Sequence, residues 1–79
     1  MKTHELKTWP EFFAAIADGR KKFEVRKDDR NFLVGELLLL REYDPEKGEY
    51  TGAELSTVIK YKLPGGSFGI QEGFCVLGI

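Results

Sequence analysis

The chain has 79 residues, of which 42% are hydrophobic and 13% aromatic, and its formal net charge is −1 at pH 7. This length suits one domain, residues 1–79, with one compact core, and the near-neutral charge excludes a protein that coats a nucleic-acid duplex by bulk attraction. A single cysteine predicts that there is no disulfide, and a longest apolar run of only residues 37–40 predicts that there is no membrane span. Together with the lack of a signal-peptide core, this predicts a cytoplasmic protein.

The first elements predicted along the chain are a short strand at residues 4–7 and a helix after it. Thr8 and Glu11 have the spacing of a capping box, and Pro10 is tolerated in the first turn of a helix. Gly19 is expected to end the helix. Four apolar residues recur at helical spacing, and this stripe is predicted to face the core: Trp9, Phe12, Phe13 and Ile16.

The remainder of the chain reads as strands separated by turns. Strands are predicted at residues 22–27, 37–42, 55–63 and 70–79. The apolar run 37–40 is typical of a strand buried on both faces, and Pro and Gly mark turns at 44–48 and 63–66. One helix and about five strands predict a mixed α+β fold, mainly β, in the form of a small, partly closed barrel with the helix over one opening.

Charged residues of both signs are concentrated between Arg20 and Arg30. In a strand over residues 22–27, Phe23 and Val25 share one face, and Lys22, Glu24 and Arg26 share the other. Such a face is either solvated, with weak surface ion pairs and lysines that protect a sheet edge, or it is a site for an anionic or hydrogen-bonding ligand. The neighbouring turn favours a site, because functional groups are often built on loops.

Other kinds of site find little support in the sequence. His4 has no cysteine or second histidine at metal-ligand spacing, so we expect no metal site and assign His4 to a partly exposed strand position. Cys75 lies in an apolar run and is expected to be a small buried hydrophobe. No cofactor is expected.

The pattern G-x-K-x-x-E-x-R, formed by Gly19, Lys21, Glu24 and Arg26, resembles the signature of ASCH domains, which are small β-barrels of the PUA-like superfamily associated with RNA. Within these domains the chain resembles one small bacterial and phage branch of unknown function more closely, and this resemblance covers nearly its whole length. Further motif residues carry that likeness: Asp29, Arg30, Phe32, Val34, Gly35, Glu36, Tyr50, Thr51, Gly52, Phe68, Gly69, Gly73 and Phe74.

The resemblance implies a ligand cleft between the helix and the barrel, with the signature strand as its wall. Lys21 is implied to reach a phosphate or carbonyl oxygen, Glu24 to accept hydrogen bonds from a base, and Arg26 to pair with phosphate or to hold Glu24. Arg30 and Thr51 are further candidate ligand-binding residues. Aromatic side chains that could support a stacked base, but equally suit packing, are Phe32, Tyr43, Tyr50 and Tyr61.

Three classes of function follow, and the sequence leaves the choice between them open. The first is a module that binds single-stranded RNA or a nucleotide-like ligand. The second is an enzyme acting on RNA or a modified nucleoside, a ribonuclease or an amidohydrolase, with Lys21 and Glu24 as catalytic residues; relatives that remove an acetyl group from cytidine have threonine at the position of Glu24. The third is a small protein-interaction module of phage or mobile-element origin, in which strand edges bind a partner. The oligomeric state is not predicted.

Overall fold

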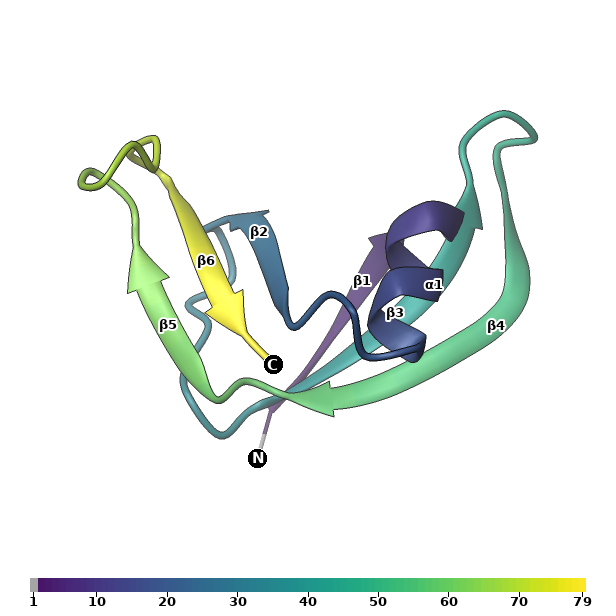
Figure 1. Cartoon of the computed structure of the whole chain (residues 1–79), viewed down its shortest axis with the longest axis horizontal. Helices are drawn as coiled ribbons and strands as arrows, with labels where there is room; N and C mark the ends of the chain where they lie inside the picture. Colours follow the sequence, from purple (N-terminus) through teal and green to yellow (C-terminus); the bar gives the residue numbers. More distant parts are fainter. Residues whose placement is uncertain (1) are drawn as a thin grey trace.

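The computed structural model describes residues 2–79 as a mainly β structure with one helix (Figure 1). This confirms the predicted mixed α+β class. The elements in chain order are β1 (Thr3–Thr8), α1 (Pro10–Ala17), β2 (Phe23–Lys27), β3 (Leu37–Asp44), β4 (Glu49–Val58), β5 (Tyr61–Pro64) and β6 (Phe74–Gly78).

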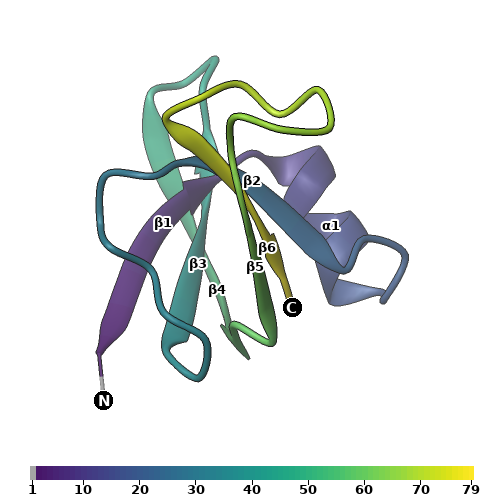
Figure 2. The ribbon, with the colours of Figure 1, turned by 90° about the vertical axis from the view of Figure 1, so that its left-hand side faces the viewer.

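The strands form two three-stranded sheets. One sheet has the order β1-β3-β4, with β1 parallel and β4 antiparallel to β3. The other has the order β2-β6-β5 and is antiparallel throughout. In Figure 2 this second sheet lies nearest to the viewer and the first sheet lies behind it.

The chain passes from one sheet to the other at Ile59 and Lys60. The Ile59 amide donates to the Glu36 carbonyl at 2.9 Å, on the side of β3. The next amide, that of Lys60, donates to the Gly78 carbonyl at 2.7 Å, in the other sheet. The single strand predicted at 55–63 is therefore wrong: its two halves bond to different sheets and are separate strands.

The hairpin of β3 and β4 is longer than the sequence indicated. Both strands flank the predicted 44–48 turn, which is confirmed: the Gly48 amide donates to the Asp44 carbonyl at 2.8 Å. Tyr50 pairs with Tyr43 next to this turn, so β4 begins well before residue 55. Its first half is polar and exposed, which is why apolar alternation did not predict it. Near the other end of the sequence, Glu72 and Gly73 form a turn, closed by the Phe74 amide, which donates to the Gln71 carbonyl at 3.1 Å, and β6 begins only at Phe74.

The core lies between the two sheets. Its fully or almost fully buried apolar side chains are Leu6, Phe32, Leu38, Leu40, Ile59, Cys75 and Leu77. The burial of Cys75 confirms its predicted role. Leu37 and Leu39 are only partly buried, so the expectation that the run 37–40 is buried on both faces is wrong: β3 packs closely on one face.

Helix α1 begins at Pro10, one residue later than it would if Thr8 were its N-cap. Thr8 is the last residue of β1, and Trp9 occupies the N-cap position without a side-chain capping bond. The predicted capping box is therefore wrong, because pairing with β3 already fixes Thr8 in a strand. Gly19 does follow the helix end, with a φ of 85° that suits glycine.

Only half of the apolar stripe of α1 packs on the core. Phe13 and Ile16 contact the core cluster. Trp9 and Phe12 are instead 50% and 42% exposed, which corrects the prediction that all four residues face inward. With eight residues, α1 is the one helix of the described chain, and it is far shorter than the roughly 20 residues that a membrane span needs.

Candidate functional site

Strand β2 buries a charged residue and exposes apolar ones, which is the reverse of the usual arrangement of a strand at the protein surface. Glu24 is only 4% exposed, whereas Phe23 and Val25 are 46% and 53% exposed. Charged groups are seldom buried without partners, because removal from water penalises the ionised form. A solvated-face interpretation therefore does not hold for Glu24, and its burial requires compensating charges.

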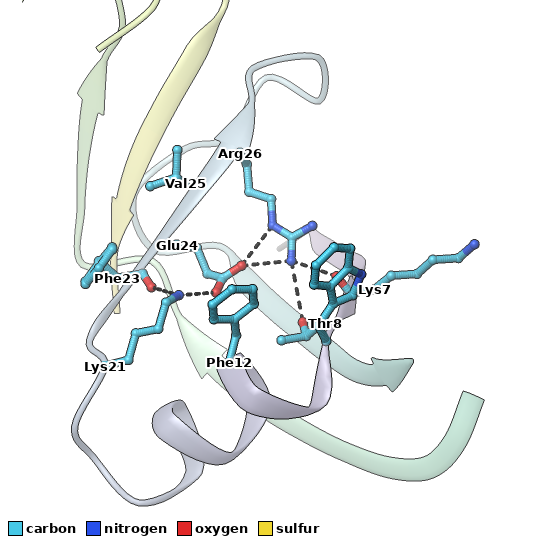
Figure 3. A pocket seen from close by; sticks show the side chains of 9 residues that line it. Lys7, Thr8, Phe12, Lys21, Phe23, Glu24, Val25 and Arg26 are labelled. Carbon is cyan, nitrogen blue, oxygen red and sulfur yellow. Dashed lines mark hydrogen bonds and ion pairs between the residues drawn. The ribbon is translucent and has the colours of Figure 1, made fainter. Parts of the chain in front are cut away.

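Two cations supply this compensation, and Lys21, Glu24 and Arg26 together form what we name the ion cluster (Figure 3). The Lys21 ammonium donates to Oε1 of Glu24 at 2.7 Å. Arg26 donates to Oε2 through Nε, and its Nη2 lies 2.8 Å from the same oxygen. The G-x-K-x-x-E-x-R motif thus places one buried carboxylate between two cations, with a net charge of +1.

Lys21 is held in place by main-chain contacts. Its amide donates to the carbonyl of Ala15 at 3.0 Å, so the turn after Gly19 is fixed against α1. Its ammonium also donates to the Phe23 carbonyl at 2.6 Å. Two of the three ammonium protons are therefore used within the protein, and one is left for a ligand.

Arg26 connects the two sheets. Its Nη2 donates to the Lys7 carbonyl at 2.8 Å and lies 3.5 Å from Oγ1 of Thr8, both on β1. Carbonyl groups of alternate β1 residues point away from β3, and that of Glu5 accepts from Nη1 of Arg30 at 2.6 Å. Guanidinium groups thus occupy an edge of β1 that has no strand partner among the described residues.

The ion cluster forms one wall of a cleft of about 460 Å³ between α1 and β2 (Figure 3). The residues that line the cleft are Lys7, Thr8, Trp9, Phe12, Lys21, Phe23, Glu24, Val25 and Arg26. Trp9 and Phe12 form a nearly parallel pair, with ring centroids 6.1 Å apart and an angle of 17° between the planes. The cleft therefore combines an exposed aromatic wall with a charged, hydrogen-bonding wall.

The structure brings together three of the five predicted ligand-binding residues. Lys21, Glu24 and Arg26 line the cleft, whereas Arg30 and Thr51 are outside its lining. Arg30 bonds to β1, and the hydroxyl of Thr51 donates to Glu42 at 2.7 Å on the exposed surface of the hairpin.

The aromatic residues of the cleft are not those that the sequence suggested as stacking platforms. Phe32 is buried, Tyr43 and Tyr50 contact each other edge to face at 5.1 Å, and Tyr61 is exposed on β5. Trp9 and Phe12 line the cleft instead. One signal could have indicated that Trp9 does not face the core: it precedes Pro10, the first residue of the helix, so helical periodicity does not apply to its side chain.

A second buried ionisable pair lies outside the cleft. His4 is 5% exposed, which corrects the expected partly exposed position. Its Nε2 lies 2.8 Å from Oε1 of Glu36, and the Leu33 amide donates to the same oxygen at 2.9 Å. The hydrogen bond with His4, followed by that with Leu33, lowers the pKa of the Glu36 carboxyl below its ordinary value. This pair fixes the segment before β3 against β1 and so has a structural role.

The cleft lining contains one carboxylate, that of Glu24, whose two oxygens both accept bonds from cations. These bonds fix the carboxylate in place as a hydrogen-bond acceptor on the cleft wall, which suits recognition of a donor group on a ligand. Among residues 2–79 there is no group of three His, Cys, Asp or Glu side chains that could hold a metal ion.

Comparisons with known proteins show a domain of unknown function and a phage protein as a relative. Residues 3–79 match the model of a family described as a domain of unknown function, DUF3850. The chain is also 36% identical over 58 residues to an uncharacterized 12.9 kDa protein in the GpA 3′ region of Escherichia phage P2; the match covers 73% of this chain and 51% of the phage protein. The chain thus spans about half the length of this relative. Because the family model matches nearly every residue, the chain belongs to the DUF3850 family.

Proposed function

We propose that the cleft between α1 and β2 binds single-stranded RNA or a nucleotide-like ligand. The observation that carries this proposal is the position of the exposed Trp9 and Phe12 rings opposite the ion cluster. Aromatic rings stack on the face of any base, with about 1–3 kcal/mol per base, and cations beside them attract the phosphate. The net charge of +1 in the ion cluster favours an anionic ligand.

We further propose that the fold is a PUA-like barrel of the ASCH type. Two features support this relationship. The chain crosses directly from one sheet to the other at Ile59 and Lys60, and Arg26 of β2 bonds to the Lys7 carbonyl of β1 in the other sheet. The signature residues also form the cleft wall, as the resemblance implies. The buried free thiol of Cys75 is consistent with a cytoplasmic setting for this function.

Fluorescence of the single tryptophan, Trp9, offers a direct test. Titration with a single-stranded RNA of about ten nucleotides should quench Trp9 emission as a base stacks on the indole. Lys21→Ala should weaken binding, and the affinity should depend less on salt, by a slope of about 1, because one phosphate contact is lost. Lys22→Ala is the matched control, since Lys22 is exposed and outside the cleft lining. Equal affinities for the two variants would contradict the proposal.

One observation favours a second candidate function, that of a protein-interaction module. The outer face of the β2-β6-β5 sheet is apolar: Phe23 and Tyr61 both pair with Gly78, and Val25 and Leu63 both pair with Val76. In Figure 2 no other sheet or helix lies in front of this face. Contiguous exposed apolar surface often marks a partner site. Tyr61→Lys should abolish binding of a protein partner and leave RNA binding unchanged, which separates the two functions.

A further inference from the structure

Strand β2 has an unpaired edge that faces the cleft. Its hydrogen bonds to β6 alternate: the Ile79 amide donates to the Lys22 carbonyl at 3.0 Å, and the Asp28 amide donates to the Gly73 carbonyl at 2.8 Å. In an antiparallel ladder, every second residue turns its main-chain groups toward the partner strand. The even-numbered residues of β2 therefore bond to β6, and Phe23, Val25 and Lys27 direct their N–H and C=O groups to the other side.

Contacts at this edge agree with the alternation. The Phe23 carbonyl points to the cleft side, where it accepts a bond from the Lys21 ammonium at 2.6 Å. Val25 follows on the same edge and lines the cleft, while its side chain points away from Glu24 in Figure 3. Among residues 2–79 no group bonds to the main-chain N–H or C=O of Val25. One donor and one acceptor thus lie side by side on the cleft wall.

We propose that the N–H and C=O groups of Val25 bind the polar edge of a single nucleobase whose face stacks on Trp9 and Phe12. This inference rests on the proposed function and deepens it, because it names the main chain of Val25 as the element that reads the base. Nucleobases carry adjacent donors and acceptors on their edges, as a strand edge does. Lys21 and Arg26 are then left for the phosphate.

A single planar group fits this edge better than a peptide strand. Added strands need a run of free main-chain groups. Here the Phe23 carbonyl is already bonded to Lys21, and Arg26 crosses from β2 to the Lys7 carbonyl just beyond Val25. Among the described residues that line the cleft, Val25 is therefore the one on this edge whose outward N–H and C=O are both free, which matches the size of a base edge.

The test uses proline to remove one donor. Val25→Pro deletes the cleft-facing N–H without breaking a bond to β6, and proline is tolerated at outward positions of edge strands. Cytidine 5′-monophosphate and adenosine 5′-monophosphate serve as probes, with Trp9 fluorescence as the readout. Val25→Pro should bind them about tenfold more weakly than Val25→Ala, as expected for one lost hydrogen bond. Lys27→Pro against Lys27→Ala is the matched control, because Lys27 is on the same edge but outside the cleft lining, and this pair should bind alike.

A measurement on the unmodified chain keeps the test independent of folding of the variants. In ¹⁵N-labelled protein the Val25 amide signal should shift strongly with either nucleotide and remain in place with ribose 5-phosphate, which has no base. Nucleotide binding that shifts Lys21 and the Trp9 indole but leaves the Val25 amide unchanged would overturn this inference and leave the proposed function standing. If neither nucleotides nor RNA shift any cleft signal at millimolar concentration, both are wrong.

Discussion

Glu24 and Arg26 are two residues apart on β2, and Nε of Arg26 donates to Oε2 of Glu24 at 2.8 Å on the inner face of the strand. The carboxylate side chain is 5% exposed and that of the arginine 24% exposed. This pair organises the cleft, because the same guanidinium also donates a hydrogen bond to the Lys7 carbonyl on β1. A motif that looks like a surface charge pattern is thus an internal link between two sheets.

The first prediction concerns the buried carboxylate. Glu24→Gln keeps the shape of the side chain but places an NH₂ group against either Lys21 or Arg26, so one donor faces another donor. We expect the free energy of unfolding to fall by about 2 kcal/mol, and the Tm to fall by roughly 10 °C for a domain of this size. Thermal unfolding followed by circular dichroism provides the measurement. Glu72→Gln, on the exposed turn before β6, is the control, and its Tm should change little. If Glu24→Gln lowered the Tm no more than this control, the ion cluster would add no stability.

A second prediction separates the two halves of the apolar stripe on α1. Phe13→Ala should lower the free energy of unfolding by about 3 kcal/mol, because Phe13 packs on the core. Phe12→Ala should cost under about 1 kcal/mol, since Phe12 is half exposed, yet it should weaken RNA binding. Urea unfolding and RNA titration of both variants test this division. The account of the aromatic wall fails if Phe12→Ala binds RNA as well as the unmodified protein.

The third prediction is a pH dependence from Glu36. Its pKa is lowered from an ordinary value of 4.5, first by the hydrogen bond with His4 and then by that with Leu33. The folded state therefore binds this proton more weakly than the unfolded state, so the contribution to stability is present above pH 4.5 and disappears as the pH falls through the folded-state pKa.

Urea unfolding at several pH values tests this linkage. Below the ordinary pKa of Glu36, the unmodified chain should lose stability more steeply than Glu36→Gln, which cannot titrate at this position. Parallel stability curves for the two proteins over that range would contradict the role assigned to the pair with His4.

The fourth prediction concerns the thiol of Cys75. Burial, assisted by the nearby charge of Asp28, raises the pKa of this thiol above its ordinary value. The thiolate is the reactive form, so Cys75 should react with a disulfide reagent far more slowly in the folded protein than in urea. Ellman's reagent measures this rate by absorbance. Rapid reaction in the folded state would show that the core around β6 opens readily.

The fold could be predicted from sequence where one physical signal dominates. The turn at 44–48 followed from proline and glycine, and the helix end followed from Gly19. The division at Ile59 and Lys60 could not be predicted, because alternation is local and does not reveal that successive residues bond to different sheets. The first half of β4 was missed because its residues are exposed and polar.

For the site too, the sequence pattern grouped residues correctly but did not show which of them are buried. The motif indicated that Lys21, Glu24 and Arg26 act together, and the structure places all three in the cleft. Alternation along β2 separated Glu24 correctly from Phe23 and Val25, but it could not reveal that the charged face is the buried one. Nor could helical periodicity indicate that Trp9 and Phe12 extend beyond the core, since this depends on how α1 is placed against β3.

The most direct test of the central claim is a ¹⁵N NMR titration of the protein with short single-stranded RNA, with Lys21→Ala and Lys22→Ala in parallel. The account predicts shifts centred on residues 21–26 and on the Trp9 indole, which are much weaker in Lys21→Ala and unchanged in Lys22→Ala. An absence of shifts at millimolar RNA, or shifts confined to surfaces away from the cleft, would contradict the assignment of this cleft as a nucleic-acid site.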